Sequence, residues 1–320
     1  MNKEEEEEEE VMETGKIVIE KVRGKSTVTK SFSKYPLKFI IPRKVAQSCF
    51  FLGLVHALFI SFFYPPNSRL NRLFLQGDAI SCKLEIGDGC TAVLTTQSST
   101  KLRVLQVYKS LGSKCSEQYL EAEIGSDSML VLIPDPVTCF STARYFQKQV
   151  FRVRSDSNLV LVDWITSGRH ESGEKWDFTL YKSTNNIFLE GEQPLFLDTV
   201  LLEQGSIVPL AERMQDYQVI AMVVLLGPML RHIQGQVQED VKRMMAEQLQ
   251  GSPVRWDCQI TSNTRDFAKK PSLIASCSAF GHKGGGIIVR IASLTTESVY
   301  QFLKHQLAGL EALLGVLPYS

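Results

Sequence analysis

Apolar and polar residues alternate along much of the first two-thirds of the chain. The stretch Ile80–Ile86 has an apolar side chain at every second position, which predicts a strand with one buried face. The triplet Gly87–Gly89 tolerates positive φ and predicts a turn, after which Ala92–Leu94 resumes the extended run. By the same criteria we expect strands at Gly15–Val22, Lys25–Thr29, Tyr35–Pro42, Trp176–Leu180, Asn186–Glu190, Leu195–Leu202 and Ser206–Pro209.

One strand–turn–strand pattern occurs three times. It covers Glu85–Leu94, Glu123–Leu132 and Ser155–Leu161, and the copies lie about 30 to 40 residues apart. Repeated units of this size stack on one another, because no single unit can bury its apolar face alone. The pattern therefore indicates stacked β layers.

Longer apolar runs follow further along the chain. Leu159–Ile165 and Gln218–Leu226 are almost continuously apolar, which predicts strands buried on both faces. Two more strands are expected at Leu273–Phe280 and Ile287–Ala292. The glycine-rich segment Gly281–Gly286 between them lacks a phosphate-binding motif, so we interpret it as a flexible hairpin loop.

The hydrophobic period changes to three and four residues in two segments of the C-terminal third. The first predicts an amphipathic helix at about 229–250 that ends near Gly251. The second predicts a helix at about 296–315, capped by Thr295 or Thr296. The pattern as a whole predicts a mainly β protein with two C-terminal helices.

Composition adds an acidic tail to this picture. The 320 residues are 44% apolar and 22% charged, which is typical of a globular protein. The glutamates Glu4–Glu10 repel one another and predict a disordered tail over 1–14, followed by a single domain over 15–320. Without these seven, 35 basic and 28 acidic residues remain (35 minus 7), so the body is mildly basic. The basic residues are scattered, and we expect no nucleic-acid partner.

The cysteines indicate a reducing compartment. The chain contains seven of them, an odd number, and none forms a CxxC pair. Its acidic start is unlike a signal peptide, so we expect a cytoplasmic protein with reduced thiols. The cysteines are Cys49, Cys82, Cys90, Cys115, Cys139, Cys258 and Cys277.

One apolar segment is unusual. Cys49–Tyr64 holds sixteen residues without a charge and is followed by Pro65-Pro66. A membrane-spanning helix needs about 17–25 such residues, so a membrane anchor is the less favoured interpretation. A buried strand pair or a buried helix is preferred. A membrane-tethered interaction protein is kept as the alternative.

Few residues in the sequence suggest a catalytic or metal-binding role. Asp163 lies within an apolar strand, where an unpaired carboxylate is costly, and Arg169 is its expected partner in a structural salt bridge. The alternative is an interior polar path lined by Asp163, His170, Glu171 and Glu174. The histidines have no metal-ligand spacing, and no Walker A, GxSxG or HExxH motif occurs. We therefore expect no stable metal site and no enzyme; a hydrolase, the third option, would show turnover by the isolated protein.

Two polar features complete the set. Thr95–Lys101 is a run of seven polar residues after an apolar strand, which is typical of a solvated strand end or the wall of a cleft. Asp135 lies between Pro134 and Pro136, which restrict the backbone and give its carboxylate a defined position.

With these residues the chain resembles the urease accessory protein D family, and most closely its plant members. The most specific segments are TTQSSTK at Thr95–Lys101, PDP at Pro134–Pro136 and DWxxxGRxxxGExW at Asp163–Trp176. The resemblance extends from about Gly15 to Ser320. Supporting stretches are Pro36–Lys38, Gly77-Asp78, Ala143–Tyr145, Met214–Tyr217 and Arg290–Ala292.

The resemblance implies a layered, β-helix-like stack of strands and a non-catalytic role. Members of this family are scaffolds for assembly of the nickel centre of urease. They bind the urease apoprotein and recruit accessory protein F, which in turn brings the GTPase accessory protein G with nickel. An internal tunnel is thought to carry the metal, so the resemblance implies nickel in transit and no stably bound cofactor.

The resemblance also implies which residues contact a partner or line the conduit. They are Asp78, Thr95, Thr96, Gln97, Thr100, Lys101, Asp135, Arg144, Asp163, Arg169, Glu174 and Trp176.

Two segments depart from the family pattern. Residues 48–76 stand where the family has a glycine-rich stretch before Gly77-Asp78, and residues 102–106 look inserted. A splice or gene-model variant with impaired activity is kept as an alternative, and sequencing of the transcript tests this hypothesis.

Overall fold

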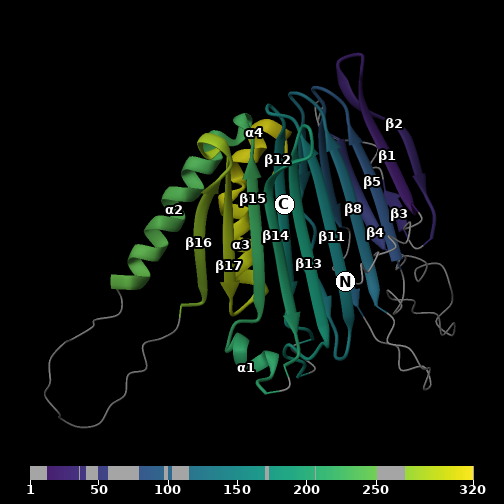
Figure 1. Ribbon diagram of the computed structural model, residues 1–320. Helices are drawn as coiled ribbons and strands as arrows, with labels where there is room; N and C mark the ends of the chain where they lie inside the picture. Colours follow the sequence, from purple (N-terminus) through teal and green to yellow (C-terminus); the bar gives the residue numbers. More distant parts are fainter. Residues whose placement is uncertain are drawn as a thin grey trace, which may run out of the picture.

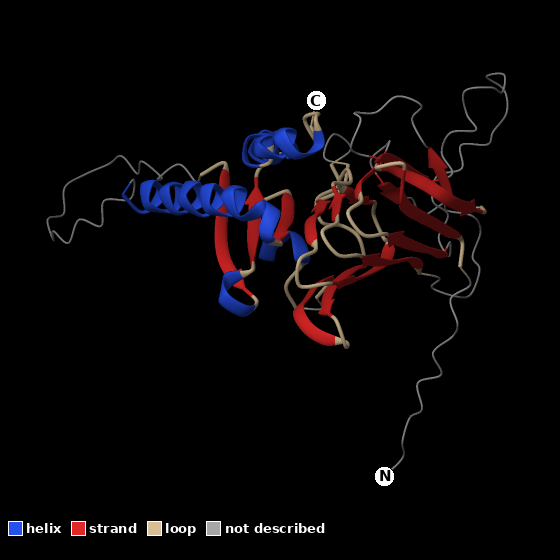
Figure 2. Ribbon diagram, turned by 90° about the horizontal axis from the view of Figure 1, so that it is seen from above, coloured by secondary structure: helices blue, strands red, loops and turns tan. Residues whose placement is uncertain are grey.

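The computed structural model describes residues 13–35, 37–40, 50–56, 79–96, 100–102, 115–169, 173–205, 207–250 and 271–319. Within them the chain forms two large β-sheets that pack face to face, with helices on one side (Figure 2). This confirms the mainly β, layered fold expected from the sequence.

The first sheet consists of long, mostly parallel strands. Figure 1 shows them side by side in the order β14-β13-β11-β8-β5-β1-β2. The inner strands pair in parallel, whereas β2 and β14 are antiparallel to their neighbours. The bounds are β1 Gly15–Val22, β2 Lys25–Ser33, β5 Ala79–Ile86, β8 Ser116–Ile124, β11 Arg144–Val153, β13 Leu180–Leu189 and β14 Gln193–Glu203.

The second sheet has the order β16-β17-β15-β12-β9-β6-β4-β3, with β10 beside β12 and β7 beside β10. Strands β4, β6, β9 and β12 run parallel, and β15, β17 and β16 add antiparallel strands at one end. The bounds are β3 Leu37–Ile40, β4 Phe50–His56, β6 Thr91–Thr96, β7 Thr100–Leu102, β9 Met129–Leu132, β10 Val137–Cys139, β12 Asn158–Thr166, β15 Val219–Leu226, β16 Leu273–Phe280 and β17 Gly286–Ser293.

The three sequence units stack as predicted, and each gives one strand to each sheet. Strands β5, β8 and β11 neighbour one another in the first sheet, while β6, β9 and β12 do so in the second. The register places Ile86 opposite Ile124, and Ala92 opposite Leu130. This alternation between two sheets gives the fold its β-helix-like character.

The turns between paired strands also stack on one another. The Gly125 N–H donates to the Ile86 carbonyl at 2.8 Å, and the Ser126 N–H donates to Oδ1 of Asp88 at 2.8 Å. In the next layer the Ser157 hydroxyl donates to the Ile124 and Gly125 carbonyls at 3.0 and 2.8 Å. The polar turn residues therefore satisfy backbone groups of the neighbouring layer, which explains why Gly, Asp and Ser recur there.

We expect Gly125→Ala to destabilise the protein by about 1–3 kcal/mol, because overpacking of a tight contact costs that much. A Cβ at Gly125 would lie 2.9 Å from the Asp88 backbone nitrogen and 3.0 Å from the Gly87 carbonyl carbon. Chemical denaturation measures the effect.

Gly235→Ala is the matched control, because a Cβ at this helical position would meet no atom within 4 Å beyond its chain neighbours and the backbone of its own helix. It should stabilise the protein by up to about 1 kcal/mol through helix propensity. Equal free energies of unfolding for the Gly125→Ala variant and the unmutated protein would contradict the stacked-turn interpretation.

Two apolar clusters hold the layers together. One fills the space between the two sheets and includes the large buried rings of Tyr145, Phe151, Trp176 and Phe178. The other lies between the second sheet and the helices. Burial of these side chains stabilises the fold by roughly 1.5–3 kcal/mol for each large apolar residue.

The helices cover the outer face of the second sheet, on the side away from the first sheet (Figure 2). Helix α2 spans Arg231–Gln250 and α3 spans Thr296–Gln306, followed by the short helix α4 at Glu311–Leu314. The Thr295 hydroxyl caps α3 by accepting a hydrogen bond from the Ser298 N–H. The two expected helices are thus confirmed, with the second broken into shorter pieces near its end.

Two expected strands are wrong. Trp176 has a positive φ of 55°, so the chain at Trp176–Leu180 turns and the strand β13 begins only at Leu180. The strand expected at Ser206–Pro209 is also wrong over its described part: residues 207–209 form no strand and lead into a short helix, α1, at Leu210–Met214, while Ser206 lies outside the described residues. Trp176 and Phe178 of the first segment are buried in the core, whereas Ile207 of the second segment is 92% exposed.

The apolar segment Cys49–Tyr64 contributes a strand within the part that the structure describes. Strand β4 pairs in parallel with β6 and in antiparallel with β3. Among the described residues, no helix has both the length and the apolar character needed to cross a membrane. The rest of 48–76, residues 103–106 and Glu4–Glu10 lie outside the described residues, so those interpretations stay predictions.

Candidate functional site

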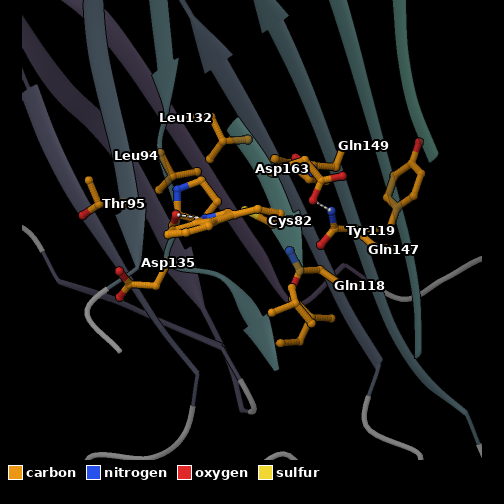
Figure 3. Close-up of a pocket in the computed structure, with 15 residues that line it drawn as sticks. Cys82, Leu94, Thr95, Gln118, Tyr119, Leu132, Asp135, Gln147, Gln149 and Asp163 are labelled. Carbon is orange, nitrogen blue, oxygen red and sulfur yellow. Dashed lines mark hydrogen bonds between the residues drawn. The ribbon is translucent and has the colours of Figure 1, made fainter. Parts of the chain in front are cut away.

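A cavity of about 40 Å³ lies between the two sheets. A space of this size can hold water, provided that polar groups line it. Strands of both sheets supply the wall, which mixes apolar side chains with polar ones (Figure 3). The polar lining residues are Thr95, Gln118, Asp135, Gln147, Gln149 and Asp163.

Asp163 is the most deeply placed carboxylate of this wall. It projects from β12 toward the first sheet and is 8% exposed. Its Oδ2 accepts from the Ser183 hydroxyl at 2.6 Å and from the Asn185 amide at 2.8 Å, and its Oδ1 accepts from the Gln147 amide at 3.2 Å. Burial raises the pKa of Asp163, and these three hydrogen bonds offset the rise only in part.

The donors around Asp163 come from an inward polar stripe on two neighbouring strands. In β11 and β13 the register places Gln147 beside Ser183 and Gln149 beside Asn185, and all four side chains are buried. Tyr145 extends the network, since its hydroxyl donates to the amide oxygens of Gln147 and Gln118 at 3.0 and 3.1 Å. Burying a polar group costs free energy unless the group is hydrogen-bonded. These paired polar side chains therefore set this part of the interior apart from the apolar core around it.

The expected salt bridge between Asp163 and Arg169 does not form. Arg169 instead pairs with Glu174: its Nε donates to Oε2 at 3.1 Å, and a second contact joins Nη2 to Oε1. The guanidinium also lies 4.4 Å from the centre of the Phe140 ring. Gly168 has a φ of 119°, which turns the chain after β12 and carries Arg169 into the loop that holds Glu174.

Glu174 therefore holds Arg169 in place through an ion pair in the loop after β12. Its hydrogen bonds to Arg169 lower the pKa of the carboxyl group, the effect expected of an ion pair. Neither Glu174 nor Arg169 belongs to the described residues that line the cavity. His170 and Glu171, the other members of the expected polar path, lie outside the described residues.

Asp135 marks the opposite end of the cavity wall from Asp163. Figure 3 shows Asp135 and Thr95 on one side of the group, and Asp163 and Gln147 on the other. The Trp164 indole donates to the Pro134 carbonyl at 2.8 Å, which fixes the main chain next to Asp135. The main chain beside this carboxylate is therefore held in place by a contact in addition to the flanking prolines.

The remaining sequence candidates are distributed over several places. Trp176 is fully buried in the core between the sheets, and its indole donates to the Tyr217 carbonyl at 2.8 Å. Arg144 begins β11. Thr96 lies in β6, whereas Thr100 and Lys101 lie in β7 beside β10. Asp78 and Gln97 lie outside the described residues.

Cysteine and histidine side chains supply no metal-binding group in the part of the site that the structure describes. Burial raises the pKa of the Cys82 thiol to about 12, so this lining residue is a neutral thiol at neutral pH. Among the residues that the structure describes, no three His, Cys, Asp or Glu side chains come together as a metal-holding group. The cysteines described as free thiols are Cys82, Cys90, Cys115, Cys139 and Cys277.

Sequence reasoning missed the inward polar stripe, although the sequence carries its signal. In β11 the alternation places Gln147 and Gln149 on the same face as the buried Tyr145 and Phe151. Glutamines within an apolar, inward-facing series are the detectable sign. A hydrogen bond also joins Tyr300 to Asp135, which lies 165 residues away in the sequence, and no local pattern indicates it.

Comparison with known proteins covers nearly the whole chain. A family model described as UreD urease accessory protein matches residues 13–319. "Urease accessory protein D" of Arabidopsis thaliana is 60% identical over 309 residues, which covers 97% of this chain and 100% of the relative. The protein of the same name from Oryza sativa subsp. indica is 52% identical, covering 96% and 95%.

A bacterial relative is more distant but aligns over a similar length. "Urease accessory protein UreD" of Sorangium cellulosum is 31% identical over 307 residues, covering 96% of this chain and 83% of the relative. Together, the match over residues 13–319 and the 60% identity to the Arabidopsis protein show that this chain belongs to the UreD urease accessory protein family.

Proposed function

We propose that the chain is a cytoplasmic, non-catalytic scaffold for urease maturation. In this role it binds the urease apoprotein and accessory protein F, and through F the GTPase accessory protein G. Nickel is the cargo, which passes along the cavity between the two sheets to the urease active site. Membership of the family supports the role in maturation, and the cavity supports the route.

The single observation that carries the route is the polar wall in an otherwise apolar interior. Asp163 and Asp135 lie at opposite ends of the wall, and the glutamine amides lie near Asp163 (Figure 3). Asp163 has no ion-pair partner among the described residues, and burial raises its pKa despite three hydrogen bonds, so keeping a carboxylate here points to a functional use. A path for a divalent cation is such a use.

The carboxylate and amide groups of the cavity wall suit transient passage of nickel better than stable binding of it. Carboxylate and amide oxygens are weaker nickel ligands than imidazole or thiolate, and the Cys82 thiol is protonated at neutral pH. The raised pKa of Asp163 means that a cation competes with a proton for the carboxylate. A conduit needs binding that is strong enough for entry and weak enough for release.

The test is a reconstituted activation assay. The purified chain, apo-urease and accessory proteins F and G are combined with nickel and GTP, and the assay follows complex formation, nickel per urease and urease activity. The proposal predicts that the four proteins co-purify and that activation depends on the chain. Activation at the same rate without the chain, or a chain that never co-purifies with apo-urease, would contradict it.

A further inference from the structure

The C-terminal helix reaches the wall of the cavity through one tyrosine. Tyr300 lies on α3, and its hydroxyl donates to Oδ1 of Asp135 at 2.9 Å. Its ring contacts Trp164 edge to face, with ring centres 4.7 Å apart. Asp135 and Trp164 both line the cavity, so Tyr300 supports two neighbouring parts of its wall from behind.

The main chain around Asp135 is held in place. Pro134 and Pro136 restrict the backbone, and the Trp164 indole holds the Pro134 carbonyl. The hydrogen bond from Tyr300 adds a restraint on the torsions of the Asp135 side chain. Burial and the nearby Asp135 carboxylate raise the pKa of Tyr300, so its hydroxyl is a donor throughout the physiological range.

We propose that Tyr300 is a positioning residue for nickel transfer, which holds the Asp135 carboxylate in one orientation at its end of the cavity. The inference rests on the proposed function, since it assigns a role within the same route. It adds a physical link between α3 on the outer face of the second sheet and the interior path. Any partner that displaces α3 would move this hydrogen bond.

Tyr319 provides a matched control on the same aromatic cluster. Its ring packs against Tyr300 at 6.1 Å between centres, with the rings nearly perpendicular. Its hydroxyl is buried and has no hydrogen-bond partner among the described residues. Removing that hydroxyl changes the cluster by one oxygen atom without touching Asp135.

The experiment compares Tyr300→Phe with Tyr319→Phe in the reconstituted activation assay. Tyr300→Phe should slow the initial rate of nickel transfer roughly tenfold, as loss of a group that orients a metal-binding side chain does. Complex formation and the melting temperature serve to show that the variant folds and assembles. Tyr319→Phe should activate urease within about twofold of the unmutated protein, because no hydrogen bond is lost.

A double-variant cycle separates positioning from a purely structural effect. If Tyr300 acts through Asp135, Tyr300→Phe should cause no further loss in an Asp135→Asn background. An equal loss in both backgrounds, or a normal rate for Tyr300→Phe beside a slow Asp135→Asn, would overturn the positioning role alone. A normal rate for Asp135→Asn would overturn the positioning role together with the cavity route of the proposed function.

Discussion

Replacing Asp163 by asparagine is expected to reduce nickel transfer to urease by roughly 10- to 100-fold, the range seen when a metal site loses an orienting or binding group. Asparagine keeps the size of the side chain and one acceptor for Ser183 or Asn185, but it removes the buried negative charge. Nickel per urease in the reconstituted assay measures the loss.

The control for this variant is assembly. Co-purification of the Asp163→Asn complex should match that of the unmutated protein, because the side chain is buried between the sheets and touches no outer surface. Unchanged nickel transfer by a fully assembled Asp163→Asn complex would count against a conduit at this carboxylate.

The pH dependence of stability gives a second readout for the same residue. Because burial raises the pKa of Asp163 above its ordinary value, the folded state binds more protons than the unfolded state between the two values. The contribution of Asp163 to the free energy of unfolding therefore falls as pH rises from the ordinary pKa toward the raised one. Denaturation at several pH values should show this fall in the unmutated protein and a smaller fall in Asp163→Asn.

Replacing Trp176 by alanine is expected to destabilise the protein by about 3–5 kcal/mol, the usual cost of removing a buried tryptophan. The ring is fully buried against Phe178, with centres 6.0 Å apart, and its indole satisfies the Tyr217 carbonyl. Chemical denaturation measures the change. A Trp176→Phe variant keeps most of the apolar contact and should lose less.

The same variant distinguishes a core residue from a conduit residue. If Trp176 acts through packing, the remaining folded Trp176→Ala protein should support activation in proportion to its amount. A Trp176→Ala protein with unchanged stability and lost activation would show instead that this side chain contacts nickel or a partner directly.

The stacked β layers follow from local chemistry, which is why the sequence predicts them well. Turn residues such as Gly125 and Ser157 have to satisfy both their own backbone and the neighbouring layer, so the same residue types recur. The apolar runs at Leu159–Ile165 and Gln218–Leu226 fall in β12 and β15, each buried on both sides. Element type is thus encoded within a few residues of each segment.

The partners within the site depend on long-range contacts, which no local pattern encodes. Arg169 is near Asp163 in the sequence, yet the donors to Asp163 come from Gln147, Ser183 and Asn185 on the facing sheet. The positive φ of Trp176 is likewise set by the packing of its ring and overrides an alternating pattern. The family motif DWxxxGRxxxGExW therefore contains one cavity carboxylate among residues that hold a loop and the core.

The most direct measurement of the central claim is nickel transfer in the presence of an excess of a bulky, charged chelator that cannot enter the cavity. If nickel travels between the two sheets, the assembled complex should load apo-urease at nearly the same rate with and without the chelator, and Asp163→Asn should lose this protected transfer. Loss of all transfer when the chelator is added to the fully assembled, nickel-loaded complex would show that the metal passes through bulk water instead.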